Sequence, residues 1–248
     1  MAKKGISRRS VLSSTALFGS YLALDPFGAE ARVISGDQPW REGAQDPPRP
    51  AEPGPYAFFT QDEAALVDAV VARFIPADDL GPGAKEAGVT FFIDRQLAGR
   101  YGRAETWYMQ GPWGDGTETQ GYQLRLTPAQ YYRTALKGID DYCRTSFSGK
   151  TFRELTAEQQ DGVLDSIDKD DVKLQGVGGK TFLDFFFHNT IEGFFADPIY
   201  GGNRDMVGWK LIGFPGARYD YRDYVTKHNQ DLGIPPVGLK GRPGWIPS

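Results

Sequence analysis

The side chains best suited to chemistry lie between positions 184 and 192. Asp184, His188 and Glu192 follow one another at four-residue spacing, so a helix would carry all three on one face. Carboxylates and an imidazole can bind a metal ion or transfer protons. Three ligands one turn apart are spread along a line, however, and cannot enclose one ion unless another segment helps. The alternative is that they form the polar side of a helix rich in phenylalanine.

The second candidate for chemistry is Cys143, the single cysteine of the chain. On the apolar side of a predicted helix it could be a buried, unreactive thiol. In an oxidising compartment it could instead form a disulfide bond with another chain. One cysteine cannot hold an iron–sulfur cluster, which needs several thiolates.

Cofactor motifs are missing from the sequence. Gly179-Lys180-Thr181 ends like a phosphate-binding loop, but Leu174 stands where the first glycine of that motif is required. No G-x-G-x-x-G, C-x-x-C-H or G-x-S-x-G sequence occurs. The sequence therefore predicts no cofactor in this chain.

The N-terminus has the pattern of a twin-arginine export signal. Arg8 and Arg9 precede a moderately apolar run at 11–24, which is shorter than the roughly 20 residues that span a bilayer. An A-x-A cleavage site ends at Ala31. We expect a signal peptide over 1–31 and export to the periplasm by the pathway that carries folded proteins.

Periodicity predicts a mainly α protein. Apolar residues recur at helical spacing, and no segment alternates with the period of a strand. The helices are expected to start near Thr60, Ala87, Thr127, Thr156, Thr181 and Met206. A helical domain over 56–232, with a long irregular loop at 99–126, is expected between extended arms rich in proline and glycine at 32–55 and 233–248. The net charge of −4 argues against a nucleic-acid partner.

The segment 188–221, HNTIEGFFADPIYGGNRDMVGWKLIGFPGARYDY, resembles the hallmark region of the gluconate 2-dehydrogenase subunit 3 family. These proteins are the small subunits of bacterial flavin-dependent sugar and polyol dehydrogenases. The motifs that carry the resemblance are DPIYGGN at 197–203, GWK at 208–210 and GFPG at 213–216, together with FFIDRQL at 91–97 and LTPAQYYR at 126–133. It extends over roughly 56–225.

The resemblance implies that this chain is a non-catalytic subunit. FAD would lie in a larger catalytic partner, and haem c in a cytochrome subunit of some complexes. This chain would bind the folded flavoprotein, stabilise it and supply its export signal, and the complex would work at the outer face of the cytoplasmic membrane. The absence of cofactor motifs beside a signal for folded proteins would then be explained.

Aromatic side chains on loops are typical anchors of protein interfaces, although they can also cover the protein's own core. The expected partner surface consists of Trp113, Tyr200, Asn203, Trp209 and Phe214. Asn203 is expected to cap the helix that carries Trp209.

Two other functions stay open from the sequence. One is a stand-alone periplasmic metal-dependent enzyme that uses Asp184, His188 and Glu192. The other is a periplasmic sugar-binding module that stacks its ligand on aromatic rings. Neither of them explains an export signal for folded proteins on a chain without cofactor motifs.

Overall fold

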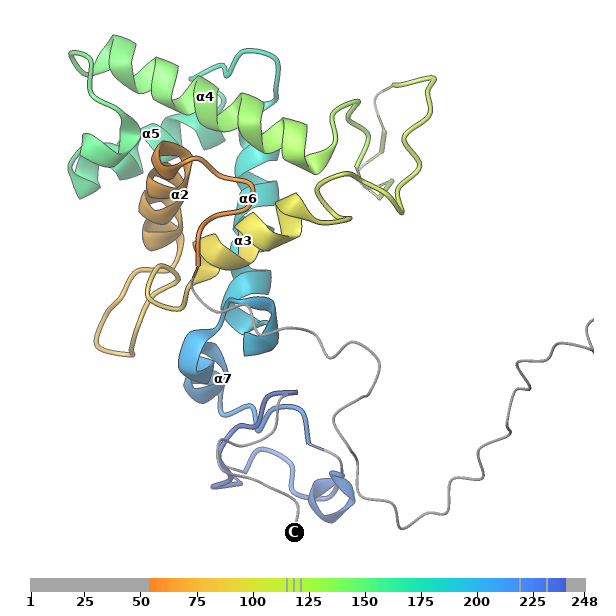
Figure 1. Ribbon diagram of the computed structural model, residues 1–248. Helices are drawn as coiled ribbons and strands as arrows, with labels where there is room; N and C mark the ends of the chain where they lie inside the picture. The colour runs from red at the N-terminus through yellow and green to blue at the C-terminus, as the bar shows by residue number, and fades with distance from the viewer. Residues whose placement is uncertain are drawn as a thin grey trace, which may run out of the picture. The chain divides into compact units, whose positions relative to one another are not determined.

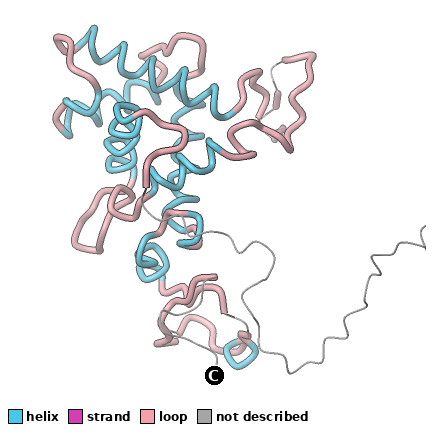
Figure 2. Tube along the Cα trace, in the orientation of Figure 1, coloured by secondary structure: helices cyan, strands magenta, loops and turns pink. Residues whose placement is uncertain are grey.

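The computed structural model describes residues 54–114, 116–117, 119–120, 122–218, 220–230 and 232–239. Over these ranges the protein has six α-helices and no β-sheet (Figures 1 and 2), which confirms the predicted mainly α class. The helices are α2 (Gln61–Phe74), α3 (Val89–Ala98), α4 (Pro128–Ser146), α5 (Ala157–Asp168), α6 (Gly179–Phe195) and α7 (Val207–Ile212). Between and after these helices lie four short 3-10 helices: η1 (Phe152–Glu154), η2 (Pro198–Tyr200), η3 (Arg204–Met206) and η4 (Arg222–Tyr224).

The predictions for Arg8, Arg9 and the signal peptide fall outside the described residues, as do most of the arm at 32–55 and the last residues of the tail. In the part of the chain that is described, no helix combines the length and the apolar character that crossing a membrane requires.

Three of the helices begin with the same local device. A threonine side chain accepts the backbone N–H three residues ahead, and the side chain at that position bonds back to the threonine N–H. The pairs are Thr60 with Glu63 in α2, Thr127 with Gln130 in α4, and Thr156 with Gln159 in α5. Because these bonds are local, the sequence alone predicts where the three helices begin.

Helix α6 is the central element of the fold. It packs against α2, α3, α4 and α5, and its C-terminal end contacts α7 (Figure 1). The sequence GGKT forms the start of this helix. Any side chain at Gly179 would collide with Ile167 of α5, so this glycine allows α5 and α6 to approach closely. The resemblance to a phosphate-binding loop therefore reflects helix packing.

Aromatic rings fill the space between α4 and α6. Tyr131 and Tyr132 of α4 are fully buried, and both pack edge-on against Phe182 of α6 at centroid distances of 5.4 and 5.2 Å. The loop between α3 and α4 extends this cluster, because Trp107 and Tyr122 lie against each other with centroids 4.9 Å apart. Part of the loop's aromatic content therefore covers the protein's own core.

Candidate functional site

The three residues proposed for metal or acid–base chemistry lie along α6 and do not converge. The Nδ1 atom of His188 is 2.7 Å from the backbone oxygen of Asp184, whose carboxylate is 4.0 Å from Lys180. Burial raises the pKa of Glu192, and His188 partly opposes this shift. Within the described ranges, no three His, Cys, Asp or Glu side chains are grouped so that they could hold a metal ion. This geometry supports the polar-face interpretation.

Cys143 is fully buried on the core side of α4. Burial raises the pKa of its thiol to about 12, and the charge of Asp140 acts in the same direction. Thiolate is the nucleophilic form of cysteine, so a buried thiol with a raised pKa is poorly reactive. Of the two alternatives for Cys143, the environment favours the unreactive thiol.

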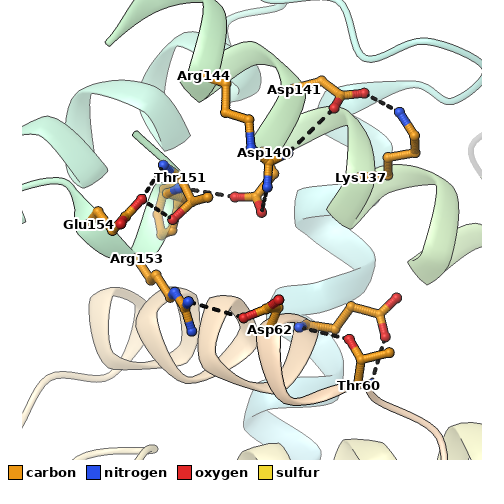
Figure 3. A network of polar contacts seen from close by, with 11 residues as sticks. Thr60, Asp62, Lys137, Asp140, Asp141, Arg144, Thr151, Arg153 and Glu154 are labelled. Carbon is orange, nitrogen blue, oxygen red and sulfur yellow. Dashed lines mark hydrogen bonds and ion pairs between the residues drawn. The ribbon is translucent and has the colours of Figure 1, made fainter. Parts of the chain in front are cut away.

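Polar contacts among charged side chains join α2, α4 and η1 (Figure 3). Beside this network, residues mainly of α2 and α4 line an open groove of about 660 Å³. Arg153 contacts Asp62 at 3.0 Å, and Asp140 accepts the backbone N–H of Phe152 at 3.0 Å. Arg144 and Lys137 contact carboxylates of their own helix. The Arg153–Asp62 pair and the Asp140–Phe152 bond thus link η1 to α2 and α4, whereas the pairs of Arg144 and Lys137 lie within α4.

The junction between α6 and α7 is held by several specific contacts. The last carbonyl groups of a helix have no partner within it and need donors from elsewhere. Trp209 supplies one through its Nε1–H, which donates to the oxygen of Phe195 at 2.7 Å. Asn203 supplies another through its side-chain amide, which donates to the oxygen of Ala196 at 2.8 Å. Two residues of the predicted partner surface thus complete the end of α6.

The side chain of Asn203 bonds to the end of α6 through its amide nitrogen and to the start of α7 through its amide oxygen. It is fully buried (0% exposed), and its Oδ1 atom accepts the N–H of Gly208 at 2.8 Å. Asn203 thus binds an N–H of the first turn of α7, although the N-cap residue of this helix is Met206. Asn203, Asp205 and Met206 have φ values of 45°, 56° and 56°, in the left-handed region that costs a residue other than glycine about 1–3 kcal/mol. Such a backbone persists only where the surrounding contacts hold it in place.

Glycines allow this segment to lie directly on α6. A Cβ atom at Gly202 would be 2.1 Å from the oxygen of Gly193, and one at Gly208 would be 2.2 Å from the oxygen of Phe194. Both distances are shorter than any tolerable contact, so backbone touches backbone at these positions. The spacing of the glycines in GGNRDMVG is thus a packing requirement.

The end of α7 is a Schellman motif. Gly213 has a φ of 68°; its N–H donates to Lys210, and the N–H of Phe214 donates to Trp209 at 2.9 Å. This motif usually includes an apolar contact across the helix end. Here the rings of Phe214 and Trp209 meet edge to face with centroids 5.2 Å apart.

This rigid junction presents apolar side chains to the solvent. Leu211 is 47% exposed, Ile212 60% and Phe214 43%, while Tyr200 in η2 is 46% exposed. We call these four residues the α7 surface. Trp209 is only 5% exposed, so it contributes to the packing of this chain and not to the exposed surface. Trp113 lies in the loop between α3 and α4, which is separate from α7 (Figure 1).

Sequence reasoning missed the role of Asp197. One carboxylate oxygen accepts the N–H of Ile199 at 3.0 Å, and the other accepts the N–H of Leu239 at 2.7 Å. Two residues before Leu239, Val237 forms a parallel β-bridge with Gly216. The described part of the predicted tail therefore folds back on the junction. An Asp-Pro pair indicates a helix end, but nothing local indicates a contact 42 residues away.

Exposed apolar side chains of this kind are typical of surfaces that bind another molecule. The family model described as gluconate 2-dehydrogenase subunit 3 matches residues 61–216, from the first residue of α2 to just beyond α7. The match covers more than half of the chain, and the chain belongs to this family. It is thus a member of a family of dehydrogenase subunits. Searches of curated proteins and of solved structures found no match.

We predict that Asn203→Ala lowers the free energy of unfolding by about 2–4 kcal/mol, because it removes two buried hydrogen bonds and places alanine in the left-handed region. Urea unfolding followed by circular dichroism measures this loss. The matched control is Asn229→Ala, since Asn229 has a φ of 54° but is exposed. Equal losses in the two variants would show that backbone strain, and not the connection to α6 and α7, dominates.

We predict that the Cys143 thiol does not react with a thiol reagent in the native protein at pH 8 and reacts fully after unfolding in guanidinium. Ser146→Cys, on the exposed end of α4, is the control for reagent access. Between pH 9 and about 12 the unfolded chain loses this proton first, so the free energy of unfolding should fall as pH rises. A dimer band that disappears on reduction would instead establish the interchain disulfide.

Proposed function

We propose that this protein is the non-catalytic small subunit of a membrane-associated, FAD-dependent sugar or polyol dehydrogenase of the gluconate 2-dehydrogenase type. It binds the folded flavoprotein, stabilises it and carries the export signal for both. The complex works in the periplasm, at the outer face of the cytoplasmic membrane, and a haem c subunit passes electrons onward in complexes that contain one. The observation that carries this proposal is the family match over 61–216.

The sequence pattern at the N-terminus supports the export role. Arg8 and Arg9 stand in the context of a twin-arginine signal, and that route accepts folded proteins. A chain with no cofactor motif of its own gains nothing from folding before export. A flavoprotein partner does, because its FAD is inserted in the cytoplasm.

The α7 surface supports the binding role. Leu211 and Ile212 are exposed apolar residues on a short helix that the junction holds rigidly. Rigid apolar side chains are efficient anchors because little conformational entropy is lost when they are buried. Binding that requires the folded flavoprotein stabilises it by mass action.

We predict that Arg8→Lys with Arg9→Lys leaves both subunits in the cytoplasm while they still co-purify. The test is immunoblotting of periplasmic and cytoplasmic fractions from cells that express both chains. A flavoprotein that still reaches the periplasm with the double variant would contradict the carrier role. A co-exported protein with its own signal is the control for an intact pathway.

We predict that Leu211→Glu with Ile212→Glu reduces recovery of the flavoprotein at least about tenfold in a tagged purification, since two desolvated charges would replace apolar anchors. The stability of the isolated chain should change little, because both side chains are exposed. Leu80→Glu, at a more exposed apolar residue outside α7, is the matched control. Equal recovery for the two variants would place the interface elsewhere.

A further inference from the structure

A buried carboxylate on α3 holds the segment that precedes the first described helix. Asp94 is fully buried and accepts three consecutive backbone N–H groups: Ala57 at 2.8 Å, and Phe58 and Phe59 at 2.9 Å each. A charged group removed from water is tolerated only where donors replace its hydration. The carboxylate and the segment thus stabilise each other.

Two arginines hold the same segment from neighbouring helices. Arg95 of α3 donates to the oxygen of Pro55 at 3.2 Å. Arg133 of α4 donates to the oxygen of Phe58 at 2.6 Å, and its guanidinium lies 4.3 Å from the centre of that ring. We call residues 55–59, with Asp94, Arg95 and Arg133, the N-terminal clasp.

The position of the clasp determines what it can do. Residues 1–53 are connected to the helical domain through it, and α2 begins only at Gln61. A force applied upstream therefore reaches the clasp before it reaches any of the six helices. A pull from the N-terminal side loads the Ala57 bond first, and each bond that is lost leaves the buried Asp94 carboxylate with fewer donors. Releasing them would leave a buried charge without donors.

We propose that the N-terminal clasp is a mechanical anchor that keeps the helical domain folded when the chain is drawn by its N-terminus. The inference rests on the proposed export role, because a signal peptide at 1–31 places the pull upstream of Gly54. A carrier that brings a bound flavoprotein through a membrane must stay folded while it is pulled. The clasp delivers that pull to α3 and α4, and through the ion pair of Arg133 with Glu63 it also supports the first turn of α2.

The test is force spectroscopy of the full chain carrying Asp94→Asn. Asparagine has the size of aspartate but places an NH₂ group where one oxygen accepts an N–H, and it removes the charge. Handles at the N-terminus and at Lys150→Cys, an exposed position after α4, keep the C-terminal segment out of the force path. The expected result is a lifetime at constant force at least about tenfold shorter than that of the chain without Asp94→Asn.

Asp68→Asn is the matched control, because the Asp68 carboxylate bonds the Thr90 hydroxyl and not the backbone of the clasp. Equal lifetimes for Asp94→Asn and Asp68→Asn would overturn the proposal. If Asp94→Asn does not fold, Arg95→Met removes the bond to Pro55 while keeping an apolar side chain, and the same comparison applies. Hydrogen exchange adds a local measurement: the amides of 57–59 should exchange at least about tenfold faster, while those of α5 do not change.

The outcome is separable from that of the export experiment. If Asp94→Asn and Asp68→Asn have equal lifetimes under force while the Arg8 and Arg9 variant still blocks export, the anchor alone is overturned. If Asp94→Asn shortens the lifetime as expected but the flavoprotein is still exported without the two arginines, the carrier role is overturned and the mechanical role of the clasp remains.

Discussion

The structure depends on how the central helix ends. Helix α6 is buried along much of its length, so the carbonyl groups at its C-terminal end need donors inside the protein. Asn203 and Trp209 supply them, and both can do so only because the chain turns back on the helix through a left-handed segment and two glycines. This closure holds α7 against α6 while its apolar residues stay exposed, and Asp197 at the same junction binds the described tail.

Much of the fold could be predicted because its signals are local. Threonine followed three residues later by Glu or Gln predicts helix starts, and helical periodicity of apolar residues predicts the elements themselves. The same local reasoning expected Asn203 to cap α7; the N-cap residue is Met206, but the Asn203 side chain does accept the N–H of Gly208 in the first turn. It could not reveal that Asn203 also caps α6, that Asp197 binds Leu239, or that Asp94 serves the segment before α2, because each contact joins distant parts of the chain.

The candidate chemistry shows the limit of spacing as evidence. Four-residue spacing predicted that Asp184, His188 and Glu192 share a face of a helix, which requires only that the helix forms. A metal or catalytic site requires convergence as well, and convergence depends on a second element that spacing cannot supply. The glycine motifs carried more information. At Gly202 and Gly208 the residue type follows from a backbone contact, whatever chemistry the protein supports.

The junction also separates what evolution can change from what it must keep. Any side chain at Gly202 or Gly208 would collide with the backbone of α6, so selection on the fold acts directly on these positions. Leu211 and Ile212 lie a few residues away and contribute little to the core. Substitution there would alter the proposed partner surface with little loss of stability. A few changes on one turn of helix would therefore give this surface a different chemistry while the junction beneath it stayed the same.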